Sequence, residues 1–188
     1  MSATVDPAIR RLLDKEDIRD ILSRYARGIN RADPELTAEL YHPDAYVDHG
    51  SFRGLGTDYA RLPRGGDAWP VSSHNFAQSH IDIEGDVAHA ESYCMFFYQK
   101  VNDELGRMRA GLMLIRYLDR FERRDGSTWK IAFRRIVLDY SHEHDLMDTW
   151  PDAAITTAGS RDLDDLAYHP ERLVPPAGWV PASDGRSG

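Results

Sequence analysis

Four residues with side chains suited to proton transfer or charge stabilisation lie where one fold could bring them together: Tyr25, Asn30, His74 and Arg134. The first two belong to an amphipathic helical segment, and the other two to segments with the alternating pattern of strands. A histidine, with an unperturbed pKa of about 6.5, can accept a proton near neutral pH. Because a helix packed across a curved sheet would place all four around one pocket, we predict acid–base chemistry on a small organic molecule.

This chemistry assigns a role to each side chain. Removing a proton beside a carbonyl or a leaving group requires a base, for which His74 is the candidate. Charge then develops on an oxygen or a leaving group, where the Tyr25 hydroxyl could donate a hydrogen bond and Arg134 could supply a fixed positive charge. Neither a metal nor an organic cofactor is required. The residues expected to contact the substrate are Asp48, His49, Phe76 and Tyr98.

Each candidate also has a purely structural interpretation. Tyr25 lies on an apolar helical stripe and is typical of a core residue, and a lone polar residue such as His74 on a strand is often structural. Arg134 stands beside Arg135, and strand alternation lets only one of the two face inward.

Two short segments contain residue types that bind metals, His42 to His49 and His142 to Asp145. In the first, Pro43 and the start of a strand break any helical spacing, and the His-x-His spacing of the second arises often by chance. We therefore expect no metal site. Asp48 and His49 are more typical of a turn at the pocket rim.

The composition excludes several classes of protein. A chain of 188 residues is the size of one domain, and its 41% hydrophobic residues suffice for a core. No apolar run reaches membrane-spanning length, and residues 1–7 lack the basic and apolar blocks of a signal peptide, so we expect no membrane partner and a cytoplasmic location. A net charge of −8 without a basic run argues against nucleic acid as a partner. The single cysteine, Cys94, is expected to be a buried apolar residue.

The first part of the chain is predicted to be mainly helical. Short helices over 6–13 and 33–41 flank a main helix, which begins at a second cap near Asp14. A strand over 45–48 and a brief helix over 57–62 follow. The buried stripe of the main helix is expected to contain Ile18, Ile21, Leu22, Tyr25 and Ile29.

From Ser72 onward the apolar pattern has a period of two. Long strands over 87–101, 110–121 and 128–140 have apolar residues on both faces, as expected of a sheet that curls around an interior and is also covered outside. Helices followed by a meander of antiparallel strands predict an α+β fold. The acidic, Pro-rich tail over 149–188 is a lid, a subunit-contact arm or disordered. In the strand segment that begins at Ser72, the residues expected to share one face are His74, Phe76, Gln78, His80 and Asp82.

Four blocks stand out in the chain: DKEDIRDILSRYARGINRAD, YHPDAYVDHG, SSHNFAQSHIDIEGDVAHAESY and WKIAFRRIVLDY. Together they resemble the SnoaL-like branch of the nuclear transport factor 2-like superfamily over residues 12–140. The resemblance implies a cone of curved antiparallel sheet closed by N-terminal helices, with a pocket inside, in a domain of residues 1–148. Within the branch, the spacing is most similar to bile acid 7α-dehydratase, hexachlorocyclohexane dehydrochlorinase and, more distantly, scytalone dehydratase.

The resemblance also implies roles for residues. These enzymes resemble one another in using a histidine base where His74 falls, a helix carboxylate where Asn30 falls and a basic residue where Arg134 falls, while Tyr25 matches a phenol that polarises an oxygen. Asn30 is the main departure from the pattern of these enzymes, because its amide accepts a hydrogen bond but, unlike a carboxylate, brings no negative charge. His74 is then the weaker base, so the reaction needs less basicity, Asp48 or another acid substitutes, or catalysis has been lost.

We therefore predict a cofactor-independent lyase or isomerase, dehydratase-like, acting on a small hydrophobic substrate with a hydroxyl or ketone group. Two alternatives remain: a non-catalytic binder of an apolar ligand, which Asn30 favours, and a structural small subunit of an aromatic-ring dioxygenase. The apolar outer faces of strands 87–101 and 110–121 predict a homo-oligomer, for which the family suggests a trimer before a dimer.

Overall fold

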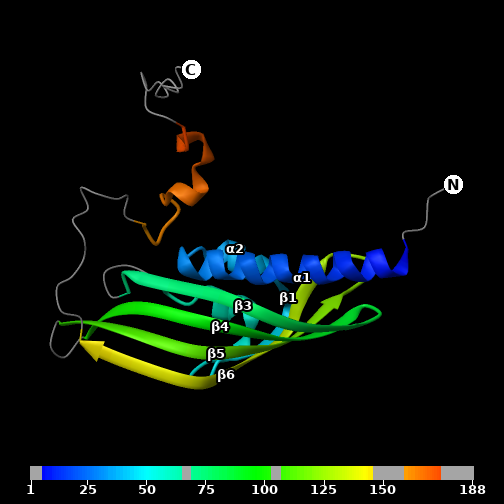
Figure 1. Ribbon diagram of the computed structural model, residues 1–188, viewed down its shortest axis with the longest axis horizontal. Helices are drawn as coiled ribbons and strands as arrows, with labels where there is room; N and C mark the ends of the chain where they lie inside the picture. The colour runs from blue at the N-terminus through cyan, green and yellow to red at the C-terminus, as the bar shows by residue number, and fades with distance from the viewer. Residues whose placement is uncertain (1–5, 65–68, 103–106, 146–158, 175–188) are drawn as a thin grey trace, which may run out of the picture.

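The protein consists of helices packed on one curved sheet, as the predicted α+β fold requires (Figure 1). The computed structural model describes residues 6–64, 69–102, 107–145 and 159–174. The helices are α1 (Pro7–Asn30), α2 (Pro34–Glu39) and α3 (Gly56–Ala60). The strands are β1 (Tyr41–Asp48), β2 (Arg53–Leu55), β3 (Val71–Glu84), β4 (Val87–Asn102), β5 (Arg107–Arg123) and β6 (Trp129–Asp145).

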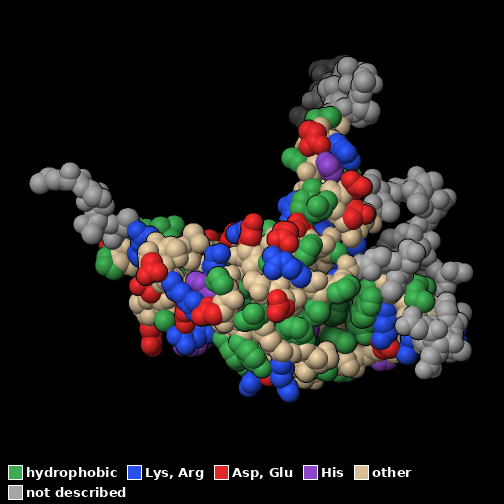
Figure 2. Space-filling view, turned by 180° about the vertical axis from the view of Figure 1, so that it is seen from behind, with side chains coloured by type: hydrophobic (Ala, Val, Ile, Leu, Met, Phe, Trp, Pro, Cys, Tyr) green, Lys and Arg blue, Asp and Glu red, His purple; other side chains and the backbone are tan. Residues whose placement is uncertain are grey.

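The six strands form one unclosed sheet in the order β2-β1-β6-β5-β4-β3. All neighbours are antiparallel except β1 and β6, which are parallel. Helix α1 lies across the sheet, above β3 in Figure 1. Figure 2 shows hydrophobic side chains gathered on the sheet side of the molecule. The described helices include none that is both long and apolar enough to cross a membrane.

Helix α1 is continuous, so the predicted break near Asp14 was wrong. Asp6 caps the helix by accepting a hydrogen bond from the backbone N–H of Ala8 at 2.7 Å, and Pro7 is its first residue. The Asp14 carboxylate is buried and accepts hydrogen bonds from Arg123 at 2.6 Å and from the Trp129 indole at 3.1 Å. Because partners 109 and 115 residues away satisfy this carboxylate, it does not cap a second helix.

Strand β1 begins at Tyr41, four residues before the predicted strand, and Pro43 lies inside it. Its pairing with β6 is interrupted between Tyr41 and Tyr46, so Pro43, which has no N–H to donate, falls where no regular ladder exists.

The close approach of α2 to α1 requires Gly28, since a Cβ there would collide with the Thr37 hydroxyl. Strand β6 continues to Asp145, five residues past its predicted end.

A bulge in β3 reverses the predicted faces of its second half. Phe76 pairs with Cys94 and Ser79 with Ser92, so β3 has one residue more than β4 in this stretch. His74 and Phe76 face the interior as predicted, but His80 and Asp82 are exposed, and Ile81 is buried. The expectation that His80 and Asp82 share a face with His74 was therefore wrong, because one inserted residue shifts the alternation by one.

A second bulge explains the orientation of Arg134. Arg120 and Phe121 of β5 pair with Phe133 and Ile131 of β6, so Ala132 is the extra residue. Arg134 therefore faces the interior together with Ile131, and Arg135 faces outward. Without this bulge, strict alternation would put Ala132 on the same face as Arg134.

Candidate functional site

A cavity of about 680 Å³ lies on the interior side of the sheet, within the range of about 300–1,000 Å³ that is typical of small-molecule sites. Its walls are largely aromatic and aliphatic, and its charged side chains are two arginines, Arg64 and Arg161. No described residue that lines the cavity carries a carboxylate. The aromatic and histidine side chains in the wall are His49, Phe52, Tyr59, Trp69, His74, Phe96 and Tyr117.

His74 is held in the cavity wall by Asn30, at the C-terminal end of α1. The Asn30 Oδ1 atom lies 2.7 Å from His74 Nδ1 and also accepts the backbone N–H of His74 at 2.9 Å. The Ser72 hydroxyl donates to the same atom at 3.4 Å. The backbone donor identifies the Asn30 atom as oxygen, and an amide oxygen can only accept, so Nδ1 carries the proton. Nε2 then holds the lone pair, which makes it the nitrogen able to accept a proton.

His74 is neutral at neutral pH. Its pKa is lowered to about 3, mainly by burial, with further contributions from His49 and from the positive charges of Arg134, Arg161 and Arg64. Its ring is stacked on Phe96, with centroids 4.2 Å apart, and meets Tyr25 edge-on at 6.3 Å. The predicted contact between His74 and Asn30 is thus present, and burial is the main reason that His74 is a weak base.

A second neutral histidine, His49, lines the same cavity. It directly follows β1, and its ring is stacked on Tyr59 of α3 with centroids 4.7 Å apart. Burial is the main cause that lowers its pKa to about 4. Burial likewise raises the pKa of the Tyr59 hydroxyl, so this phenol stays protonated.

Tyr25 and Arg134 lie behind the wall and not in it. Both side chains are 0% exposed, and neither lines the cavity. The Arg134 guanidinium forms two hydrogen bonds with Asp119, at 2.7 and 2.8 Å, and lies against the rings of Tyr25 and Tyr117, 4.1 and 4.5 Å from their centroids. Burial is the largest single effect and lowers the pKa of Arg134, but the charge and hydrogen bonds of Asp119, together with Tyr41 and Tyr25, raise it overall. A buried pair therefore supports the aromatic wall beside His74.

Of the four residues predicted to contact the substrate, only His49 lines the cavity, and the other three lie outside its lining. The Asp48 carboxylate accepts the backbone N–H of Gly50 and lies near Arg53 and Arg135, so it stabilises the turn that carries His49. Phe76 packs against Tyr25 and Tyr117. Tyr98 donates a hydrogen bond to Glu143 at 2.7 Å and packs against Trp69 and Phe96, two residues of the wall.

The sequence did not reveal the two cavity arginines. Arg64 follows α3, and its guanidinium lies 4.2 Å from the Tyr59 ring centroid. Arg161 is 131 residues from Asn30 in sequence, yet it donates hydrogen bonds to the backbone carbonyls of Ile29 and Asn30 at 3.1 and 3.0 Å and to Trp69 at 2.6 Å. No local motif marks it, because its position depends on where the segment of residues 159–174 docks.

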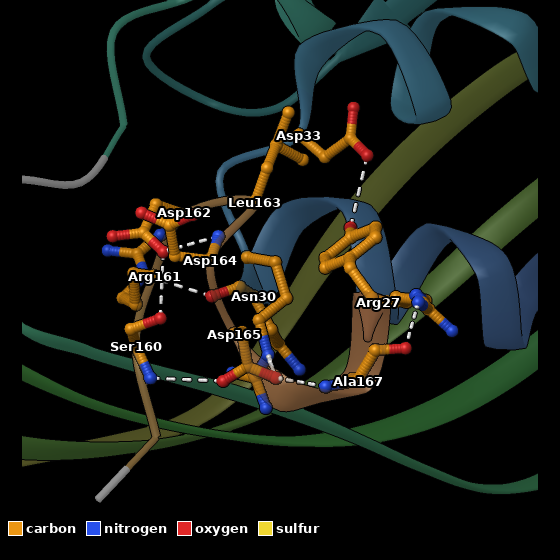
Figure 3. A network of polar contacts seen from close by, with 12 residues as sticks. Arg27, Asn30, Asp33, Ser160, Arg161, Asp162, Leu163, Asp164, Asp165 and Ala167 are labelled. Carbon is orange, nitrogen blue, oxygen red and sulfur yellow. Dashed lines mark hydrogen bonds and ion pairs between the residues drawn. The ribbon is translucent and has the colours of Figure 1, made fainter. Parts of the chain in front are cut away.

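This C-terminal segment is attached to the end of α1 by further polar contacts (Figure 3). Arg27 donates a hydrogen bond to the Ala167 carbonyl at 2.6 Å, and Asp33 accepts one from the Tyr168 hydroxyl at 3.0 Å. Arg31 forms an ion pair with Asp165 at 3.1 Å. The segment thus covers the helix end that holds Asn30. Within the described residues, no group of three or more His, Cys, Asp or Glu side chains is arranged to hold a metal ion.

Comparisons with known proteins agree with this architecture. The sequence model of a family described as the SnoaL-like domain matches residues 10–135. A putative scytalone dehydratase from Novosphingobium aromaticivorans superposes with a TM-score of 0.61 and 21% identity, over 75% of this chain and 94% of that chain. The LinA-type3 hexachlorocyclohexane dehydrochlorinase from Novosphingobium barchaimii superposes with a TM-score of 0.65 and 19% identity, over 77% of this chain and 99% of that chain.

A nuclear transport factor 2-like superfamily protein from Salmonella enterica superposes with a TM-score of 0.56 and 20% identity, over 68% of this chain and 92% of that chain. No curated protein matches the chain. At these identities the likeness establishes a shared fold, and the chemistry has to be argued from the cavity.

Proposed function

The chain belongs to the SnoaL-like domain family, and on that basis we propose that it is a cofactor-independent lyase or isomerase of the dehydratase type. The observation that carries the proposal is the pair of Asn30 and His74, which supports Nε2 as a proton acceptor in a largely apolar cavity. The size and aromatic walls of the cavity suit a cyclic hydroxylated or ketonic substrate.

In the proposed elimination, His74 both accepts and returns a proton. Its Nε2 takes a proton from the carbon beside a carbonyl, and the electron pair of the broken C–H bond forms the new double bond. The C–O bond at the next carbon breaks, and the leaving hydroxyl takes the proton back from the imidazolium and departs as water. The sum is the loss of one water molecule, without any oxidant or reductant.

The low pKa of His74 shapes this reaction. An imidazole with a pKa of about 3 is a weak base, but its protonated form gives up the proton readily to a leaving hydroxyl. The proton acceptance must therefore be assisted by a substrate with an acidified C–H bond. The protonated Tyr59 hydroxyl and the cavity arginines can stabilise the oxygen on which charge develops. We assign Tyr25 and Arg134 a supporting role behind the wall, since neither lines the cavity.

A second candidate function is the binding of an apolar ligand without catalysis. The specific observation in its favour is the same pair: an amide cannot stabilise a protonated His74 as a carboxylate would, and the pKa of His74 is low. The two functions share one cavity and differ in whether a proton is transferred.

Exchange of the C–H hydrogens of a small ketone for deuterium distinguishes these functions. We would incubate the protein in D₂O with 2-tetralone, a bicyclic ketone with acidic C–H bonds beside its carbonyl, and follow deuterium uptake by NMR. The proposal predicts exchange above the buffer rate, reduced at least roughly a hundredfold in His74→Gln. His80→Gln is the matched control, because His80 lies on the same strand but is exposed. Exchange that survives in His74→Gln would refute the role of His74, and binding without exchange would favour the binder.

A further inference from the structure

The charge of the cavity is unbalanced, which points to the class of ligand. Arg64 and Arg161 line it, no described lining residue is acidic, and its two histidines are neutral. The other buried arginine nearby, Arg134, is neutralised by Asp119. The net charge at the cavity wall is therefore positive, although the chain as a whole carries a net charge of −8.

The hydrogen bonds of Arg161 leave part of its donor capacity unused. Its guanidinium has five N–H groups, and three of them are used by carbonyls of Ile29, Asn30 and Trp69. These partners are neutral, so only the weak negative end of the α1 dipole offsets the charge. One N–H on each terminal nitrogen is left over, and Arg161 forms no ion pair within the part of the chain that the structure describes.

Arg64 offers a second cation on the same cavity. One of its terminal nitrogens donates to the Ala60 carbonyl at 3.1 Å, and its guanidinium lies over the Tyr59 ring. It has no ion-pair partner among the described residues. Burial is the main cause that lowers the pKa of Arg161, and the positive charges of Arg64 and Arg31 lower it further. A ligand anion would offset these positive charges.

We propose that the ligand of this cavity is an aromatic or alicyclic carboxylic acid, whose carboxylate binds at Arg161 and Arg64 while its ring system occupies the apolar part beside His74. The assignment deepens the proposed function and rests on it for the identity of the site. A carboxylate matches the planar donor geometry of guanidinium. The aromatic walls formed by Phe96, Tyr117 and Trp69 match a ring system.

A bound carboxylate would also assist the chemistry. A negative charge in the cavity favours the protonated form of His74 and raises its pKa, which offsets the effects of burial and of the arginines. The ligand would thus supply the negative charge that Asn30 lacks. The C-terminal segment has a defined part in this arrangement, since it provides Arg161 and holds it against the end of α1 (Figure 3).

The test compares two probes of the same shape by calorimetry, 2-naphthoate and its neutral amide, 2-naphthamide. We expect the wild-type protein to bind the acid at least about tenfold more tightly, the usual effect of one charged hydrogen bond in place of a neutral one. Arg161→Gln and Arg64→Gln should each remove most of that preference. Arg61→Gln is the control, because Arg61 lies three residues before Arg64 but pairs with Glu35 at the surface.

The remaining outcomes are equally informative. Equal binding of acid and amide, or no binding of either, would overturn the inference, as would a preference that both Arg64→Gln and Arg161→Gln retain. Because Arg161→Gln also removes hydrogen bonds that attach the C-terminal segment, the Arg64→Gln variant, which leaves those bonds in place, decides whether charge is responsible. A preference for the acid without any His74-dependent exchange would preserve this inference and refute the proposed lyase.

Discussion

Replacement of Asn30 by aspartate tests the pair at the centre of the site. Asn30→Asp changes one NH₂ group to oxygen and keeps the size of the side chain. The new carboxylate would still accept the hydrogen bonds from His74 Nδ1, the His74 backbone N–H and the Ser72 hydroxyl. The substitution therefore adds a negative charge beside the imidazole with little change in shape, and we expect the fold to tolerate it.

The size of the effect follows from the distance. Asn30 Oδ1 lies 2.7 Å from Nδ1, so the centres of the two charges would be about 4 Å apart. At an effective dielectric constant of about 20 this attraction is about 4 kcal/mol, or about three pKa units, as an upper value. The cost of desolvating the carboxylate reduces it. We expect the pKa of His74 to rise by about one to three units from its value of about 3 in the native protein.

The assay is an NMR titration of the His74 ring in both proteins, with the exposed His80 as an internal reference. Asn75→Asp is the matched control: it adds the same charge one residue away, on the exposed face of β3, and should leave the pKa of His74 nearly unchanged. An unchanged pKa in Asn30→Asp would refute the pairing. In the exchange assay, an enzyme limited by basicity should gain rate in Asn30→Asp, whereas a pure binder should stay inactive.

Three other measurements test the structure around the site. The folded-state pKa values of His49 and His74 lie below the unfolded value of about 6.5, so the unfolded state binds more protons and the free energy of unfolding should fall as the pH drops from about 6.5 to 4. In His49→Gln, the free energy of unfolding should fall less between these two pH values, which thermal unfolding at each pH would measure. Arg134→Met should cost about 3–5 kcal/mol in urea unfolding, because it leaves Asp119 buried without a partner, and adding Asp119→Leu should restore part of the loss. Finally, Met95, Leu114 and Tyr140 form an exposed apolar row across three strands, so light scattering should show an oligomer, and Leu114→Glu should dissociate it; a monomeric native protein would contradict the expected assembly.

Much of the site could be predicted because it depends on short-range patterns. The stripe of α1 placed Tyr25 in the core correctly, since helical periodicity decides which residues face a sheet. His74 could be placed because it precedes the bulge in β3, whereas His80 and Asp82, which follow it, were put on the wrong face. A bulge depends on how two strands pair, which the alternation within one strand does not reveal.

The sequence by itself determined the α+β class, the family and the order of helices and strands, and its resemblance to the family implied that His74 pairs with the amide of Asn30. Only the tertiary structure decided that Arg134 and Tyr25 lie behind the wall and that Arg64 and Arg161 line it. The physical reason is the range of the interactions. The periodicity of a helix or strand depends on residues that are close in sequence. The burial of Arg134, in contrast, depends on Asp119 of another strand, and the position of Arg161 depends on the carbonyl of Asn30, 131 residues away.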